Sequence, residues 1–149
     1  MTTPSPHAQQ VETSLLQALL AAEHAAIYGY GVLGARLDAA TQPAARLASD
    51  GHRARRDALT ALLLDRAAAA PAAQLAYDVR VANQAEALAL AVRLEEGLAA
   101  RWRDLVGGAT ALPVRLLGAS GLSEVAVRAT SWRLLLGRRP ATVALPGQG

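Results

Sequence analysis

A glutamate and a histidine interrupt the most apolar stretch of the chain, LLAAEHAAIYGYG at residues 19–31. In a helix, Glu23 shares a face with four apolar side chains: Leu16, Leu20, Ile27 and Tyr30. A carboxylate at an apolar position needs a cationic partner, a metal ion or a raised pKa. His52, seven residues before Leu59, and Glu95, in the middle of an apolar seam, raise the same question. We therefore expect Glu23, His52 and Glu95 to point inward at similar height.

One alternative for these residues is a metal site. A di-metal carboxylate bundle needs a glutamate on each of two helices and a Glu-x-x-His motif on each of the other two. Glu23 and Glu95 match the two single glutamates. The sequence SDGH at 49–52 keeps the histidine but lacks the glutamate, and EVAV at 124–127 lacks the histidine. At most, a reduced site of Glu23, His52 and Glu95 remains for iron or another divalent metal.

Nearby arginines favour a network made of protein groups alone. Arg55 and Arg56 flank the face of His52, and Arg128 borders the apolar stripe of the last predicted helix. A buried carboxylate held by such cations is retained because removing one partner is strongly destabilising. We predict no catalytic residue, no cofactor, and a buried polar cluster of Glu23, His52, Arg56, Glu95 and Arg128. A small-ligand pocket built from the same groups remains a further alternative.

The elements that must position these residues are helices, because apolar residues recur at helical spacing between Pro- and Gly-containing breaks. We predict helices at 11–38 and 44–69, a third ending at Gly107, and a fourth at 112–136. The second is expected to bury Leu47, Leu59, Leu62 and Leu63. The third has the clearest seam: Leu88, Ala91, Glu95, Leu98, Trp102 and Leu105. The fourth is expected to bury Leu122, Val125, Ala129, Trp132 and Leu136.

The predicted domain layout is a flexible tail at 1–10, a helical domain at 11–137 and an extended tail at 138–149 that folds back on the helices. Helices of about 25 residues suit an antiparallel four-helix bundle. The link between the second and third helices is longer than a tight turn, as in bundles with one crossover. Gly118 and Gly121 weaken the fourth helix, where we expect a kink or break. The glycines at 29, 31 and 34 are expected to allow close helix approach.

The chain resembles the alanine-rich ferritin-like domains of unknown function found in high-GC bacteria. The resemblance rests on LLAAEHAAIYGYGVLGARL, HRARRDAL, LALAVRLEEGLAARWRDLV, AVRATSWR and the closing PATVALPG, which occur in this order along nearly the whole chain. It implies an all-α, ferritin-like antiparallel four-helix bundle and no established activity. We therefore expect a non-catalytic interaction or small-ligand-binding protein with a degenerate metal site. A metal-binding carboxylate protein with oxidase or iron-handling activity is the alternative.

Composition excludes several classes of function. The net charge is +3, but fifteen arginines alternate with twelve acidic residues, so no nucleic-acid partner is expected. Cysteine is absent, which excludes disulfides, thiolate-held clusters and a cysteine nucleophile. No secretory signal or membrane span is predicted, and the expected location is the cytoplasm. Surfaces rich in Ala and Leu predict a homodimer formed through helix faces. No role is expected for His7, and His24 is expected to make a helix-surface contact.

Overall fold

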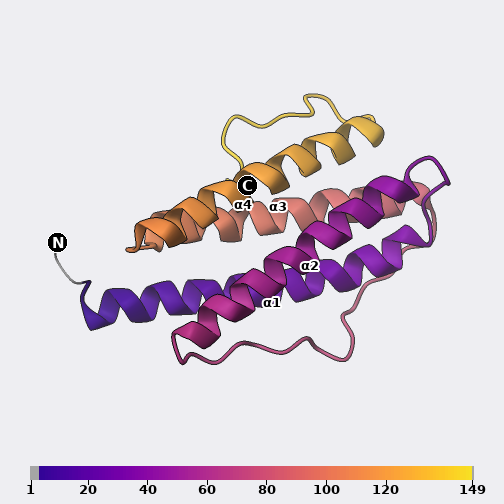
Figure 1. The fold of residues 1–149 in the computed structure, drawn as a ribbon. Helices are drawn as coiled ribbons and strands as arrows, with labels where there is room; N and C mark the ends of the chain where they lie inside the picture. Colours follow the sequence, from indigo (N-terminus) through magenta and orange to yellow (C-terminus); the bar gives the residue numbers. More distant parts are fainter. Residues whose placement is uncertain (1–3, 149) are drawn as a thin grey trace.

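In a computed structural model, which describes residues 4–148, the chain folds into a four-helix bundle (Figure 1). The four helices of this range are α1 (Pro6–Gly34), α2 (Gln42–Asp65), α3 (Gln84–Gly108) and α4 (Leu112–Leu135). Residues 4–148 contain no β-strand. The predicted all-α class and four helices are confirmed. Residues 1–3 of the predicted flexible tail and residue 149 lie outside the described range.

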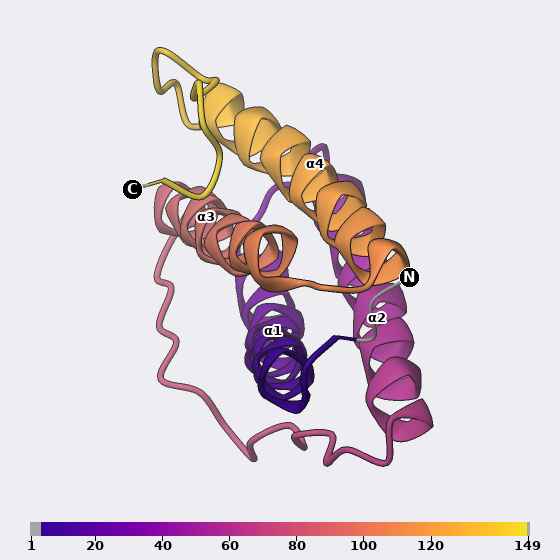
Figure 2. The ribbon, with the colours of Figure 1, turned by 90° about the vertical axis from the view of Figure 1, so that its left-hand side faces the viewer.

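The helices form two antiparallel pairs, α1 with α2 and α3 with α4, and α1 also packs against α3 (Figures 1 and 2). The segment 66–83 joins the pairs and runs back along the length of the bundle, so α2 and α3 point in the same direction (Figure 1). The connection between α3 and α4, in contrast, is a short turn. This topology brings the middle of each helix to the centre of the molecule.

The helix ends follow local capping chemistry. α1 begins five residues before the predicted start, because Ser5 caps it by accepting a hydrogen bond from the Ala8 amide and Pro6 occupies its first turn. At the start of α3, Asn83 accepts from the Glu86 amide while Glu86 accepts from the Ala82 amide, at 2.9 and 2.8 Å. The first bond satisfies an amide that the helix itself leaves unpaired, and the second fixes the residue before the N-cap.

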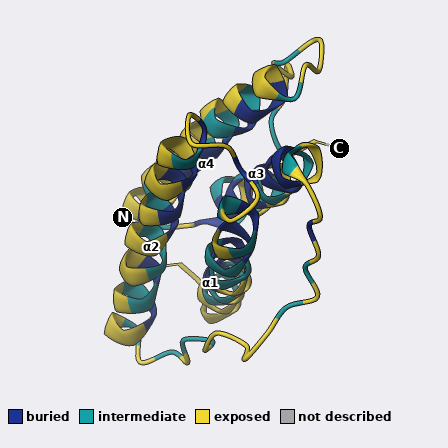
Figure 3. Ribbon diagram, turned by 90° about the vertical axis from the view of Figure 1, so that its right-hand side faces the viewer, coloured by how far each residue is buried: buried dark blue, intermediate teal, exposed yellow. Residues whose placement is uncertain are grey.

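The inward faces of the helices are buried (Figure 3) and form two hydrophobic clusters. All six seam residues predicted for α3 are buried. Leu47 is a wrong prediction, since its side chain is 75% exposed and α2 instead buries Ala45 and Ala48 beside His52. The buried face of α2 beside His52 is therefore formed by small side chains and does not include Leu47.

Two groups of glycines differ from expectation. α4 runs without a break through Gly118 and Gly121, which face α3: a Cβ at Gly121 would overlap the Trp102 ring. These glycines permit close packing and do not interrupt the helix. On α1, only Gly29 allows such an approach, with a Cβ there lying 2.7 Å from Leu94; a Cβ at Gly31 or Gly34 would meet nothing within 4 Å.

The C-terminal segment, residues 138–148, contains no helix and returns over α3 and α4 (Figures 1 and 3). Arg133 Nη1 donates a hydrogen bond to the Ala141 carbonyl at 3.0 Å. Gly147 lies directly on α3, because a Cβ there would be 2.6 Å from the Ala99 carbonyl oxygen. Within residues 4–148, no helix is long and apolar enough to cross a membrane.

Candidate functional site

Three helices meet at a cluster of buried charged side chains. Glu23 of α1, His52 of α2 and Glu95 of α3 each have 0% exposure, although they are 29 to 72 residues apart in sequence. His52 stands between the two carboxylates: Nδ1 is 2.8 Å from Glu23 Oε2, and Nε2 is 3.0 Å from Glu95 Oε1. The cluster thus links α1, α2 and α3 through one imidazole ring.

The surroundings of His52 favour its doubly protonated form. A carboxylate only accepts hydrogen bonds, so each ring nitrogen that faces one must carry a proton. Burial alone would lower the pKa of His52, but the hydrogen bonds to Glu23 and Glu95 and their negative charges raise that pKa above its ordinary value. His52 is accordingly an imidazolium that bridges two carboxylates.

Arg128 of α4 completes the charge balance. Its Nε lies 3.1 and 3.2 Å from the two oxygens of Glu95. Two carboxylates, one imidazolium and one guanidinium sum to zero charge, which is the condition under which buried ions are tolerated. Arg128 also ties the fourth helix to the cluster.

Tyr30 and Trp132 extend the cluster by hydrogen bonds. Tyr30 Oη donates to Glu95 Oε1 at 2.5 Å, and Trp132 Nε1 donates to Tyr30 Oη at 2.8 Å. Burial, followed by the charge and the hydrogen bond of Glu95, raises the pKa of Tyr30 well above its ordinary value. Tyr30 is therefore a neutral donor. The sequence placed Tyr30 and Trp132 on buried stripes, but did not indicate that their polar atoms would reach Glu95.

Two polar atoms at the cluster lack a partner within the described chain. They are Glu23 Oε1 and Arg128 Nη2, both shielded from solvent. An unsatisfied buried group costs roughly 1 to 3 kcal/mol. The cluster is charge-balanced, but not every hydrogen-bonding position in it is filled by protein.

The donor set does not fit a di-metal centre. Ligands of a shared metal must point at one position, whereas Glu23 and Glu95 contact opposite edges of the His52 ring. Arg128 holds the Glu95 carboxylate with a fixed positive charge that would repel a cation. Among residues 4–148, no group of three or more His, Asp or Glu side chains is arranged to hold a metal ion. No reaction step is therefore assigned to a metal.

Other predicted site residues lie elsewhere. Arg56 was expected in the buried cluster, but its Nε donates to its neighbour Asp57 at 2.8 Å on the outer side of α2. Arg55 instead turns toward α4, where it pairs with Glu124 and lies over the Trp102 ring. The helical angle explains the difference, because Arg55 and Arg56 lie on opposite sides of His52, about 60° and 40° around the helix, and α4 lies on the side of Arg55.

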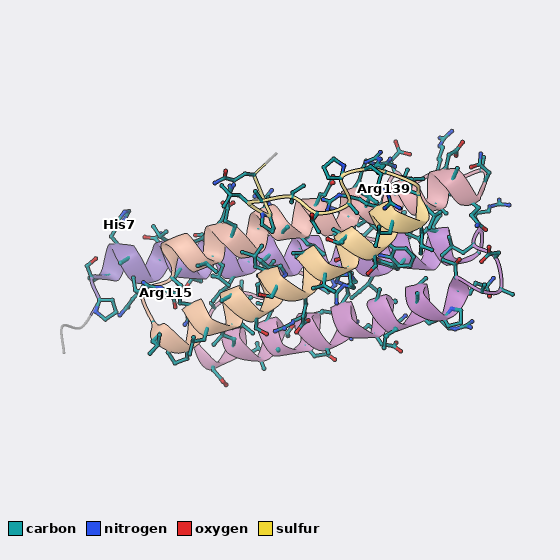
Figure 4. All side chains as sticks on the ribbon, turned by 90° about the horizontal axis from the view of Figure 1, so that it is seen from above. His7, Arg115 and Arg139 are labelled. Atoms are coloured by element: carbon teal, nitrogen blue, oxygen red, sulfur yellow. The ribbon has the colours of Figure 1, made fainter. Side chains whose placement is uncertain are left out.

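The other two histidines are peripheral. A ring nitrogen of His24 lies 3.0 Å from the Pro71 carbonyl oxygen, which attaches segment 66–83 to α1. His7 belongs to the first turn of α1 and projects away from the other helices (Figure 4). Neither contacts the central cluster.

A second buried carboxylate, Glu12, was not anticipated. It accepts hydrogen bonds from the Thr110 and Ala111 amides at 2.6 and 3.0 Å and pairs with Arg66 at 2.6 Å. Burial alone would raise its pKa, but the bonds from Ala111, Arg66 and Thr110 lower the pKa below the ordinary value. Glu12 lies in the segment predicted as the start of the first helix. Nothing in the sequence indicated that it would contact the α3–α4 turn and the end of α2.

A cavity lies away from the cluster, between α3, α4 and the C-terminal segment. This space, called here the α3–α4 groove, has a volume of about 1000 Å³. Small side chains line its floor: Gly97, Ala99 and Ala100 of α3, and Ala126 and Ala129 of α4. Val143 and Gly147 of the C-terminal segment form part of the opposite wall. A smaller hollow of about 520 Å³ lies between the end of α1 and α2, beside Gly31 and Gly34.

The chain belongs to a family of unknown function. Residues 15–149 match the family described as "Domain of unknown function (DUF4439)". The chain is also similar to a conserved hypothetical protein, rv2844, from Mycobacterium tuberculosis, whose crystal structure superposes with a TM-score of 0.85. The two sequences are 36% identical, and the match covers 93% of this chain and 99% of that one. No curated protein matches the sequence.

Proposed function

We propose that this protein is a non-catalytic helical bundle that binds a small molecule in the α3–α4 groove. The observation that carries the proposal is the groove itself, an open cavity of about 1000 Å³ walled by two helices and the C-terminal segment. Ligand pockets are characteristically clefts of roughly 300 to 1000 Å³ lined mostly by apolar side chains with a few polar groups. The groove lies at the upper end of that size range, and its lining combines small apolar side chains with polar and charged ones.

The state of the central cluster supports a structural role for it. Glu23, His52 and Glu95 are fully buried, and their charges are balanced by one another and by Arg128. A general acid or base must reach a substrate proton. In this cluster, the only member with appreciable exposure is Arg128, whose side chain is 20% exposed. We assign the cluster to holding four helices in register.

The position of the cluster also supports a degenerate metal site in a ferritin-like scaffold. Glutamates on α1 and α3 and a histidine on α2 meet at the centre of the bundle, which is where ferritin-like proteins place their metals. Arg128 on α4 supplies the positive charge that a metal would otherwise provide. The long segment 66–83 between the two helical pairs has the form of the crossover in such folds.

An amide ¹H–¹⁵N correlation spectrum, recorded with a library of small neutral, cationic and anionic compounds, tests the proposal. We expect shift changes at Gly97, Ala100 and Ala126 that saturate with ligand. Ala126→Leu, which would fill the groove floor, should abolish them, whereas Ala119→Leu on the exposed side of the same helix should not. Shift changes that are absent from the groove, or that survive Ala126→Leu, would overturn the proposal.

A second candidate function is metal binding at the cluster. The observation in its favour is the buried, unpartnered Glu23 Oε1, an oxygen of the type that hard cations prefer. Metal analysis of protein purified without chelator separates the two candidates. One equivalent of iron or another divalent metal per chain would support metal binding at the cluster, and less than a tenth of an equivalent would contradict it.

A further inference from the structure

The α3–α4 groove has the chemistry of a site for a long-chain carboxylate, and this inference rests on the proposed ligand-binding function. We infer that the apolar chain of a fatty acid lies along the floor formed by Gly97, Ala100 and Ala126, with its carboxylate at Arg93. The charge of the groove, its floor and its length carry the argument independently of the buried cluster.

The floor suits an aliphatic chain. Its Gly and Ala side chains extend no further than a methyl group. The hydroxyls of Thr130 and Ser131, which also line the groove, donate to the Ala126 and Val127 carbonyls of their own helix. Val127 and Val143 add apolar walls. Among the described residues that line the groove, none is aromatic, so a nucleobase or other planar ring would find no stacking partner there.

The charges at the groove favour an anion. Three arginines line it, Arg93, Arg103 and Arg133, against one acid, Glu96. Arg133 is committed to Glu96 at 2.8 Å and to the Ala141 carbonyl, and Arg103 pairs with Asp104 at 3.2 Å. Arg93 is exposed and forms no ion pair with any residue in the range 4–148. Its guanidinium can therefore bind a carboxylate through two parallel hydrogen bonds without breaking an existing contact.

The spacing of two arginines along α3 matches a chain anchored at one end. Arg93 and Arg103 are ten residues apart on α3, which corresponds to roughly 15 Å along the helix. This is the scale of an extended dodecyl chain. The C-terminal segment closes one side, since Gly147 packs against the Ala99 backbone and Ala141 is held by Arg133. A groove with small apolar side chains along its floor and one available cation at an end favours an amphipathic anion over a compact one.

Calorimetric titration of delipidated protein with dodecanoate, below its micelle concentration, tests the inference. We expect saturable binding of one molecule per chain, and dissociation constants at least tenfold higher for the neutral analogue dodecanol and for Arg93→Ala. Arg101→Ala, an equal charge change at an exposed position of the same helix outside the groove, should bind as the wild type does. Equal binding of dodecanol, or unchanged binding by Arg93→Ala, would overturn the inference.

The two levels of the proposal fail in different ways. If dodecanoate does not bind while other compounds of the library shift the groove amides, the ligand class is wrong and the ligand-binding function stands. If neither dodecanoate nor any library compound perturbs the groove, both are wrong.

Discussion

Replacing Glu23 with glutamine tests the balance of charge in the buried cluster. The substitution keeps the shape of the side chain and leaves an oxygen that can still accept from His52 Nδ1, now 2.8 Å from Glu23 Oε2. It removes one of the two negative charges that hold the imidazolium. The cluster is then left with an excess positive charge inside the protein, unless His52 loses a proton and with it one of its two hydrogen bonds.

Either outcome lowers the stability of the fold. A hydrogen bond to a charged group contributes about 1.5 to 3 kcal/mol, and the amide retains part of it, so we expect Glu23→Gln to lower the free energy of unfolding by about 1 to 3 kcal/mol. For a chain of this size, this corresponds to a fall in thermal midpoint of roughly 3 to 9 °C. Urea denaturation and scanning calorimetry at pH 7 measure both quantities.

Glu124→Gln is the matched control, because Glu124 also pairs with an arginine but its side chain is 45% exposed. A solvent-exposed pair contributes at most about 1 kcal/mol. If Glu23→Gln is no more destabilising than Glu124→Gln, the cluster does not stabilise the bundle through its charges and the reasoning above is refuted.

Four further predictions follow from other contacts. Because the pKa of His52 is raised in the folded state, the contribution of His52 to stability is complete below its ordinary pKa and is lost as the pH rises through the raised value. Urea denaturation of the wild type at pH values from 6 to 9 should show this loss. If the His52→Gln variant shows the same loss, His52 is not its cause. The pKa of Glu12 is lowered, so its contribution is present above its ordinary pKa and is lost as pH falls; acid unfolding of Glu12→Gln should depend less on pH, and an unchanged acid limb would contradict the assignment. Gly121→Ala should destabilise the fold by about 1 to 3 kcal/mol, because the new Cβ would overlap the Trp102 ring. Gly31→Ala, which has open space around it, should stabilise α1 by up to about 1 kcal/mol. Equal effects of the two variants in chemical denaturation would count against the packing of Gly121 on Trp102. The exposed leucines at 47, 64, 112 and 116 support a homodimer, so light scattering at high micromolar concentration should give twice the chain mass, and a monomer throughout would contradict it.

The inward orientation of the central residues could be predicted because helical spacing decides it. Glu23, His52 and Glu95 all lie at the spacing of their neighbouring apolar residues, and all three are fully buried. The seam of α3 was the clearest case, since six residues at alternating three- and four-residue intervals define one face without help from the rest of the fold. Periodicity within a helix does not, however, determine which residue of a neighbouring helix it meets.

The predictions that were wrong concern contacts between different helices. Arg55 and Arg56 both flank the face of His52, and Arg56 was predicted to lie in the cluster. The position of α4 decides instead that Arg55 reaches Glu124, whereas Arg56 pairs with Asp57. Gly118 and Gly121 were expected to weaken α4 because glycine lowers helix propensity. The close packing of Val106 and Trp102 on those positions requires the absence of a side chain and outweighs that cost. Glu12 could not be predicted because its partners at Thr110 and Ala111 are about 98 residues away in sequence.

The central claim is that the buried histidine is held by protein carboxylates in place of a metal, and the imidazole nitrogens of His52 report on it directly. A long-range ¹H–¹⁵N correlation spectrum at pH 7 should show both nitrogens protonated, since each faces a carboxylate. Addition of one equivalent of Zn²⁺ or Mn²⁺ should leave both signals unchanged. A neutral ring with one unprotonated nitrogen, whose signal shifts or broadens when the metal is added, would contradict the account.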